Sequence, residues 1–351
     1  MSEKAPAISV IMAVYNTEKY VAEAIESILC QTYRDFEFII VDDASTDSSA
    51  DIIEHFQETD NRIRIIRNEC NSGLGISLQR GVKSARGQLI ARMDADDISL
   101  VDRFEKQVNH LNNHPEIMVL GCDHLIINET GEIINDLIYP KNPEIMRWNM
   151  LLGSGLIVSN GATMIRKELF DEVGDFGDFR AAQDFEFWSR LFEYDPLPIA
   201  NLNNVMYYYR QHEKTITKSQ SSLQERNAIQ VRQGKIEEFL GRSVSPQVVL
   251  AYRHPGDNYD DILLCIQTWV EIYERFIGCF QVKKETRAFI KAELVNNLNK
   301  YIYIRPNHLQ GRRRASFWRV LPFLPINLAF DLLLYKLKWV KNFLSQGTRS
   351  F

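Results

Sequence analysis

The sequence predicts an α/β fold built on a mostly parallel sheet, and three observations lead to this prediction. Residues 7–14 and 36–41 are short and almost wholly apolar, as strands buried on both faces should be. The segments between the predicted strands have the spacing of amphipathic helices. Polar and acidic clusters follow several of these strands. Such alternation of strands and helices is typical of parallel sheets with right-handed crossovers.

The first predicted helix runs over residues 17–32, with Thr17 as its cap. Its apolar stripe consists of Val21, Ala24, Ile25, Ile28 and Leu29. A helix is then expected from about Asp47, a strand at 62–66, and a glycine-containing loop, "NSGLG", before a helix that ends at Ala85. The strand "QLIARM" (88–93) follows. Because ligands bind beyond the carboxyl ends of parallel strands, the polar clusters there should converge on one crevice.

From about residue 115 the alternation becomes irregular. Strands are expected in 117–128 and 132–140, and "GATMIRKELF" (161–170) is predicted to be a strand entering a helix. A helix that begins with an acid is predicted over 183–194, and "NVMYYYRQHEKTIT" follows it. Residues after about 215 are helical and charged in pattern. We therefore expect a catalytic domain over 1–220 and a helical extension over 221–351.

The bulk composition is that of an ordinary globular protein, with 45% hydrophobic and 25% charged residues. A net charge of −5 argues against a general nucleic-acid binder. The five cysteines are scattered without a CxxC pair, which favours free thiols in a reducing cytoplasm. The start "MSEKAPAISV" lacks the apolar core of a signal peptide, and no apolar run reaches ~20 residues. We therefore expect a cytoplasmic protein without a conventional membrane span.

Asp94 and Asp96 directly follow the strand at 88–93, in "DADD". Residues two apart in an extended segment face the same way, so both carboxylates should project together while Ala95 turns aside. Paired carboxylates of this kind suit a hard divalent cation that keeps water and phosphate ligands. A solvated turn with a helix cap explains the same residues, and the triplet alone does not decide between them.

Candidate nucleotide-binding residues follow the other strands. Asp43 can accept a hydrogen bond from a ring N–H of a base, and Tyr15 offers a flat face for stacking. The alternative is that Asp42 or Asp43 caps the next helix. Arg67 is a candidate for pairing with base or phosphate, and the glycines of "NSGLG" allow the backbone to approach a ligand.

Taken in order, "ISVIMAVYN", "IIVDDASTD", "NSGLG", "MDADD", "GATMIRKELF" and "QDFEFWSRL" resemble the inverting glycosyltransferases of family 2, which have the GT-A fold. The resemblance covers roughly the first 220 residues and implies a nucleotide-diphospho-sugar donor. It implies that Ala13, Tyr15 and Asp43 line the nucleobase pocket, with Arg67 and Ala95 also in the donor site. It further implies that Asp94 meets the ribose or the metal and that Asp96 holds Mn²⁺ or Mg²⁺.

By the same resemblance Asp184 is the general base. Gln183 stands where the family usually has glutamate, a departure that concerns the neighbour of the base. An acceptor hydroxyl is a poor nucleophile, so a carboxylate must take its proton, and a cation stabilises the departing diphosphate. In-line displacement then inverts the anomer, and an α-linked donor gives a β-linked product. The alternative is that Asp184 only caps a helix over 184–194.

Arg210 and His212 lie where family members often carry Arg-x-His. Such a segment can close over the pyrophosphate, with Arg210 pairing to it and His212 near the metal. An ordinary surface loop is the alternative. Phe185, Phe187 and Trp188 can stack on an acceptor sugar, but packing of the apolar helix face explains them more simply.

The segment 311–344 is basic and aromatic with internal prolines. It suits a helix or helix pair on an anionic membrane surface, where lipid-linked acceptors are found, or docking onto the catalytic domain or a second subunit.

The overall pattern is most similar to bacterial enzymes that extend lipooligosaccharide, capsule or exopolysaccharide chains. This implies transfer of GlcNAc, Gal or Glc from a UDP-sugar to a saccharide or a lipid-linked saccharide. A sugar-phosphate nucleotidyltransferase is a rival, but it needs a glycine- and arginine-rich phosphate loop that "AVYNTEKY" does not offer. A degenerate sugar-binding module is the second rival, and the intact Asp43, Asp96 and Asp184 argue against it.

Overall fold

The computed structural model describes residues 5–177, 182–213, 215, 221–254, 261–303, 315–316 and 320–333 of the chain. Its contacts divide the chain into two compact units. The first unit comprises Met1–Met146 and Leu156–Ala228, and the second comprises Arg147–Gly155 and Ile229–Phe351.

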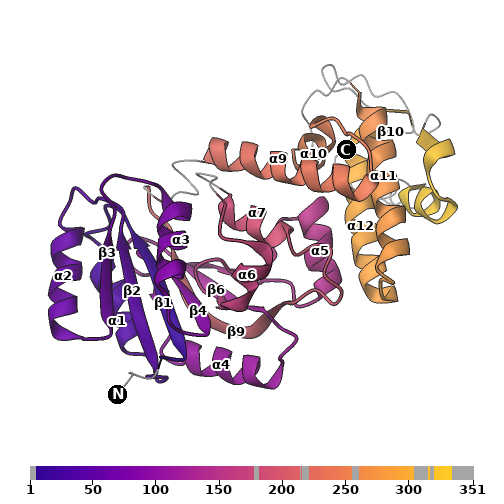
Figure 1. Cartoon of the computed structure of the whole chain (residues 1–351). Helices are drawn as coiled ribbons and strands as arrows, with labels where there is room; N and C mark the ends of the chain where they lie inside the picture. Colours follow the sequence, from indigo (N-terminus) through magenta and orange to yellow (C-terminus); the bar gives the residue numbers. More distant parts are fainter. Residues whose placement is uncertain are drawn as a thin grey trace, which may run out of the picture. The chain divides into compact units, whose positions relative to one another are not determined.

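The first unit is built on a nine-stranded sheet in the order β3-β2-β1-β4-β8-β6-β9-β5, with β7 paired to β6 (Figure 1). The strands are β1 (Ile8–Val14), β2 (Phe36–Asp42), β3 (Ile63–Arg67), β4 (Leu89–Asp94), β5 (Ile98–Ser99), β6 (Val119–Ile127), β7 (Ile133–Leu137), β8 (Met164–Arg166) and β9 (Ile199–Arg210). The pairs β3–β2, β2–β1, β1–β4 and β6–β9 are parallel, whereas β8 is antiparallel to both β4 and β6. The predicted mostly parallel α/β fold is confirmed.

Alternation along the strands assigns a helix layer to each face of the sheet. The helices of this part are α1 (Val21–Leu29), α2 (Ser49–Thr59), α3 (Leu74–Ser84) and α4 (Arg103–Asn113). The core that joins α1 and α4 to the sheet takes Val10 and Met12 from β1, whereas Ile11 faces Gly81 of α3 on the other side. A Cβ on Gly81 would lie 2.4 Å from the Ile11 side chain, so only glycine allows α3 to pack this closely.

The face of the sheet that α3 covers therefore carries the strand residues that alternate with those of the core on the other face. Ala13 of β1 lies between Val41 and Asp94 in the register of the sheet. Asp94 and Arg92 of β4 face the same side as Ala13, because residues two apart on a strand share a face. The carboxyl ends of β1, β2 and β4 consequently lie at one edge of the sheet, where Ala13, Arg92 and Asp94 share one face.

The remaining helices of the chain are shorter or lie toward the C-terminus. They are α5 (Pro143–Leu151), α6 (Glu168–Val173), α7 (Gln183–Ser189), α9 (Ser221–Leu240), α10 (Gln247–Arg253), α11 (Ile262–Cys279) and α12 (Lys284–Tyr301). Two short strands, β10 (Ile302–Tyr303) and β11 (Ala315–Ser316), pair with each other, and η1 (Leu321–Phe323) is a 3₁₀ turn. None of the helices in the described ranges is both long and apolar enough to cross a membrane.

The second unit has its own aromatic core. Trp269 of α11 packs against Tyr252 of α10 and donates its indole N–H to the Val248 carbonyl at 2.7 Å. Trp148, from the excursion 147–155, packs against Phe276 with ring centroids 5.5 Å apart. This packing explains why residues 147–155 belong to the second unit although the chain on both sides of them belongs to the first.

Two local expectations differ from the structure. Thr17 does not cap α1 with its side chain; its carbonyl oxygen accepts hydrogen bonds from the N–H groups of Tyr20 and Val21. The helix expected over 183–194 ends at Ser189, so α7 is about half as long as its apolar pattern predicted. Phe187 and Trp188 are buried, in agreement with the core-packing interpretation of this segment.

Candidate functional site

The loops after β1 and β2 are tied together at the carboxyl edge of the sheet. Asn16 and Ala44 both adopt positive φ angles, of 53° and 60°. The Asn16 carboxamide oxygen accepts a hydrogen bond from the Thr46 N–H at 2.7 Å. Tyr15, between the strand and this link, is 45% exposed, which leaves its ring free to meet a ligand. Its predicted role in stacking a base stays a prediction.

Asp43 organises the glycine-containing loop. Its carboxylate is 3% exposed and accepts hydrogen bonds from the Ser72 and Gly73 N–H groups, both at 2.8 Å, and from the Asn68 side-chain amide at 2.6 Å. Gly73 has a φ of 91°, a conformation that side chains with a Cβ rarely adopt. The "NSGLG" loop thus wraps around this carboxylate, one of whose oxygens has a single donor among the described residues. Asp43 does not cap α2, whose N-cap is Ser48.

Arg67 points away from this loop. As the last residue of β3 it pairs with Glu54 of α2, and both side chains are exposed. Asn68, the next residue, turns to the α3 face and reaches Asp43 and the Ser77 hydroxyl. Arg80 of α3 also donates to Asn68. The structure therefore brings Asn68, and not Arg67, to the predicted base-binding residue Asp43.

Asp94 lies in a partly buried position beside two groups that sequence reasoning missed. Arg92, with a 2% exposed side chain, donates to the Asp94 carboxylate at 3.1 Å. The Asp94 N–H donates to the Tyr207 hydroxyl of β9, also at 3.1 Å. Burial raises the pKa of the Asp94 carboxyl; Arg92 opposes this shift, and the charges of Asp96 and Asp184 add to it. The cation that this acidic stretch requires is thus partly supplied by the chain's own Arg92.

The next two acids have separate partners. Asp96 lies 2.9 Å from the ring nitrogen Nε2 of His212, so the structure brings these two predicted metal ligands together. Asp97 is 1% exposed and accepts the Arg210 backbone N–H at 2.8 Å. Burial raises the pKa of Asp97 well above its usual range, and the charges of Asp96 and Asp94 raise it further. Ala95, between these acids, is buried in the apolar core, and its predicted place in the donor site stays a prediction.

Arg210 holds the loop of residues 95–97 in place through several contacts. Its guanidinium is 3% exposed, donates through Nε to the Asp96 carbonyl at 2.9 Å, and pairs with Glu23 of α1 at 2.5 Å. Two further contacts, each at 3.3 Å, go to the carbonyls of Asn128 and Glu129. The predicted pairing of Arg210 with a pyrophosphate stays a prediction, and it would require the Glu23 contact to open. Thr217, expected in the same closing segment, lies outside the described residues.

Asp184 lies in the first turn of α7. Its carboxylate accepts a hydrogen bond from the Asn160 side-chain amide and another from the Phe185 N–H at 2.7 Å. Its charge adds to the raised pKa of the Asp94 carboxyl, after burial and the charge of Asp96. Asp184 is not the N-cap of α7, because the helix begins at Gln183 and the N-cap residue is Ala182.

Asn160 and Gly161 connect the two acids. The Asn160 carboxamide oxygen accepts the Trp188 indole N–H at 2.8 Å, while its amide nitrogen donates to Asp184. A Cβ on Gly161 would lie 2.6 Å from both the Asp94 carboxylate and the Tyr207 hydroxyl, so glycine is required for this approach. No sequence spacing points to Asn160, whereas Arg92 could have been found from its i−2 position relative to Asp94.

Asp94 and Asp96 offer oxygen ligands, and His212 offers an imidazole nitrogen. This set of ligands suits Mn²⁺ or Mg²⁺. Within the described ranges no three His, Cys, Asp or Glu side chains converge as a ready metal-binding group. The Asp96–His212 pair, with Asp94 two residues away, would leave the other positions around a cation to a bound diphosphate and to water.

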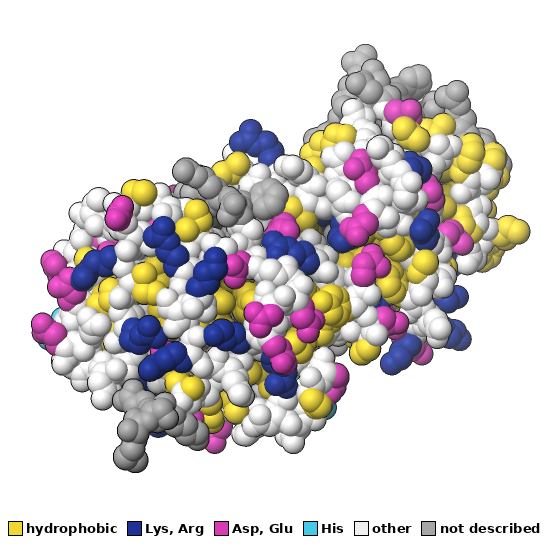
Figure 2. Space-filling view, in the orientation of Figure 1, with side chains coloured by type: hydrophobic (Ala, Val, Ile, Leu, Met, Phe, Trp, Pro, Cys, Tyr) yellow, Lys and Arg dark blue, Asp and Glu magenta, His cyan; other side chains and the backbone are white. Residues whose placement is uncertain are grey.

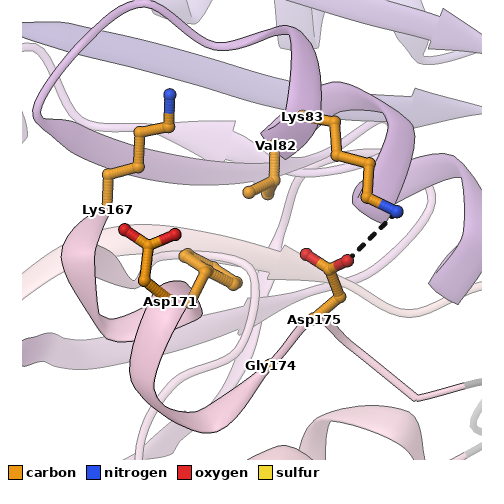
Figure 3. Close-up of a pocket in the computed structure, with 7 residues that line it drawn as sticks. Val82, Lys83, Lys167, Asp171, Gly174 and Asp175 are labelled. Carbon is orange, nitrogen blue, oxygen red and sulfur yellow. Dashed lines mark ion pairs between the residues drawn. The ribbon is translucent and has the colours of Figure 1, made fainter.

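A separate pocket of about 250 Å³ lies between α3 and α6 (Figure 3). Three of its charged groups have partners: Lys83 pairs with Asp175 at 3.2 Å, and Lys167 donates to the Ala85 carbonyl at 2.6 Å. Gln79 also donates to Asp175. These contacts tie α3 to the loop that precedes α7, which is a structural role.

Comparison with known proteins agrees with this geometry. The family described as "Glycosyl transferase family 2" matches residues 9–174. The putative glycosyltransferase EpsE of Bacillus subtilis (strain 168) is 34% identical over 232 residues, which are 65% of this chain and 81% of that protein. The O-antigen biosynthesis glycosyltransferase WbnJ of Escherichia coli is 35% identical over 215 residues, 60% of this chain and 82% of that protein.

The fold has solved counterparts as well. The crystal structure of S. aureus TarS 1–349 in complex with UDP-GlcNAc superposes with a TM-score of 0.54 at 19% identity, covering 84% of this chain and 81% of that one. Such a likeness shows a shared glycosyltransferase fold, in agreement with the GT-A prediction. The order of motifs, the sheet and the relatives lead to one conclusion: the chain belongs to glycosyltransferase family 2 and is a glycosyltransferase.

Proposed function

We propose that the enzyme transfers a hexosyl or N-acetylhexosaminyl group, with GlcNAc, Gal or Glc as the candidates, from a UDP-sugar to a saccharide or glycolipid hydroxyl. The transfer inverts the anomeric carbon and gives a β-glycosidic bond. The observation that supports this most directly is the Asn160–Gly161 link, which contacts Asp184 on one side and Asp94 on the other. UDP is favoured because TarS, with a similar fold, was solved with UDP-GlcNAc.

In this proposal Asp184 is the general base. As the acceptor oxygen bonds to the anomeric carbon, Asp184 takes the hydroxyl proton, and the bond between that carbon and the diphosphate breaks with its electrons leaving on UDP. Asp184 keeps accepting capacity for this proton, because a carboxylate has about four lone-pair sites and the described residues supply two donors.

The donor lies, in this proposal, along the carboxyl edge of the sheet. Tyr15, Ala13 and Asp43 take the base, and Asn68 joins them through its contact with Asp43. Asp96, His212 and Asp94 would hold Mn²⁺ or Mg²⁺, whose chemistry there is to neutralise charge on the diphosphate. Arg67 and Arg210 are assigned less direct parts, since each is already paired with a glutamate.

The proposal includes peripheral contact of the segment 311–344 with the inner face of the cytoplasmic membrane, near lipid-linked acceptors. Of this segment only residues 315–316 and 320–333 lie within the described part of the chain.

Nucleotide release from UDP-, GDP- and dTDP-sugars, measured with and without acceptor, tests the assignment of the base. Asp184→Asn should lower turnover ~10²–10⁴-fold, the usual contribution of one general base. Asp171→Asn, the same exchange at an exposed acid of α6, is the matched control and should leave turnover unchanged. Full turnover by Asp184→Asn would overturn the proposal.

The same assay addresses the metal and the rival functions. EDTA and Asp96→Asn should each abolish release, and undiminished activity under both would overturn the metal assignment. Pyrophosphate as the product in place of UDP would indicate a nucleotidyltransferase. Sugar binding without UDP release under any acceptor would indicate a binding module.

A further inference from the structure

The two oxygens of the Asp43 carboxylate are not equally occupied. Oδ1 accepts hydrogen bonds from the Asn68 side-chain amide at 2.6 Å and from the Ser72 N–H at 2.8 Å. Oδ2 accepts the Gly73 N–H at 2.8 Å and has no second donor among the described residues. Since a carboxylate oxygen accepts about two hydrogen bonds, Oδ1 is filled, and Oδ2 keeps one position for a ligand.

Arg80 of α3 sets the orientation of the Asn68 carboxamide. A guanidinium only donates hydrogen bonds, so its contact with the Asn68 oxygen leaves the amide nitrogen to face the other way. That nitrogen donates to Asp43 and to the Ser77 hydroxyl, the latter at 2.9 Å. Both amide hydrogens are thereby used, and the Asn68 side chain is 6% exposed. Asn68 is thus fixed on Oδ1 and keeps a ligand from that oxygen.

Nucleobases differ in the number of N–H groups that they can offer to this carboxylate. Uracil and thymine carry a single ring N–H, at N3, which matches the one open position on Oδ2. Guanine carries N1–H and the N2 amino group side by side, a pair that suits both oxygens of a carboxylate. With Oδ1 filled, the guanine amino group would be buried without an acceptor, which weakens binding. Cytosine and adenine present an acceptor nitrogen at the same place and would be repelled.

We infer that Asn68, held by Arg80, restricts the nucleotide-sugar donor to a uracil or thymine nucleotide, because it fills the Asp43 oxygen that guanine would need. This inference rests on the proposed role of Asp43 in binding the base. It deepens that role, since the preference for UDP otherwise depends on the likeness to TarS. Asn68 acts here through Asp43 and determines specificity without contacting the reacting atoms.

Inosine diphosphate provides a direct test, because its base has the N1–H of guanine and lacks the N2 amino group. In isothermal titration calorimetry the full-length wild type should bind UDP at least about tenfold more tightly than GDP, and inosine diphosphate more tightly than GDP by a similar factor, the effect of one unpaired buried donor. Asn68→Ala opens a position on Oδ1. The affinity difference between GDP and inosine diphosphate should therefore disappear in this variant.

Arg80→Met is the second variant, for the case in which circular dichroism shows that Asn68→Ala does not fold. Arg80 is exposed, and Figure 2 shows Lys and Arg side chains on the face of the first unit where Figure 1 draws α3. Its replacement should leave the fold intact, release the Asn68 oxygen, and reduce the preference for inosine diphosphate over GDP about threefold. Lys83→Met removes a charge from the same helix and is the matched control, which should keep the wild-type preference.

The outcomes separate this inference from the function on which it rests. A wild type that binds no nucleotide would overturn the assignment of Asp43 together with the inference. A wild type that binds UDP, but binds GDP and inosine diphosphate equally, would overturn the inference alone. The same holds for a folded Asn68→Ala that keeps the full difference or, where that variant does not fold, for an Arg80→Met that keeps it.

Discussion

At the scale of single residues, the orientation of one carboxamide sets the geometry of the proposed base. The Trp188 indole N–H is a donor only, so its contact at 2.8 Å requires the oxygen of Asn160 to face it. The amide nitrogen of Asn160 is then the atom that faces Asp184. Asn160 is thus a positioning residue, held by a buried tryptophan on the helix that carries the base.

Asn160→Ala should lower kcat roughly tenfold to a hundredfold while the KM for the donor changes little, because the base is retained but no longer aimed. Trp188→Phe should reproduce part of this loss, since it frees the Asn160 oxygen that the indole fixes. Steady-state kinetics with both substrates varied would check this, with thermal unfolding to confirm the fold. An Asn160→Ala enzyme with wild-type kcat, or one whose loss lies wholly in KM for the donor, would contradict the positioning role.

Residue-scale features also show what sequence could and could not anticipate. Strand alternation led to the expectation that Asp94 and Asp96 project together, and the same rule, applied toward the start of the strand, would have found Arg92. Strand alternation also explains why Arg67 and Asn68 have different partners. Adjacent residues at a strand end face opposite helix layers, so Arg67 reaches Glu54 of α2 while Asn68 reaches Asp43. Asn160 could not be found, because its contact with Asp184 depends on how the loop before β8 packs against α7.

At the scale of secondary-structure elements, Glu37 joins the amino-terminal ends of the strands, opposite the proposed site. Its carboxylate, 3% exposed, accepts hydrogen bonds from Ser9 of β1 at 2.7 Å, from Arg64 of β3 at 2.8 Å, and from Arg86 before β4 at 2.9 Å. Burial alone would raise the pKa of Glu37, but these donors outweigh it and hold the pKa below its ordinary value.

Because the folded protein binds the proton of Glu37 less readily than the unfolded chain, its contribution to stability is present above the unfolded pKa of ~4.3 and is lost as pH falls below it. Glu37→Gln should therefore lower the free energy of unfolding by about 1–3 kcal/mol at pH 7, and by less at pH 4. Urea unfolding at both pH values checks this. Glu26→Gln, an exposed acid of α1, is the control, and an equal effect of both variants at pH 7 would contradict the prediction.

Hydrophobic spacing predicted the strands and helices correctly where the buried residues follow the period of that element. The parallel strands β1 to β4 were located to within one or two residues. For β1 and β2 the reason is that strands buried on both faces leave an almost unbroken apolar run. α7 was overestimated because Leu191 and Phe192 continue the apolar pattern of the helix, yet they are buried in the turn that follows it. The apolar pattern beyond Ser189 thus reflects burial of these side chains and not a longer helix.

At the scale of the whole molecule, the chain leaves the first unit and returns to it. Residues 147–155 belong to the second unit, with the Trp148 ring fully buried and its indole N–H donated to Glu293 at 3.2 Å. Composition alone could not reveal this excursion, since its partners lie more than 100 residues later in the chain. A fragment that ends at residue 228 therefore keeps an apolar segment whose partners have been removed.

We expect the fragment 1–228 to self-associate, and Trp148 to be exposed to water in it. In a Trp188→Phe background Trp148 is the one tryptophan left in this fragment, so a red-shifted emission and efficient acrylamide quenching would report its exposure directly. Trp148→Ser in the same fragment should reduce the self-association seen by light scattering, because it removes the exposed apolar ring. A monomeric fragment with Trp148 shielded from quencher would instead mean that residues 147–155 find sufficient packing without the second unit.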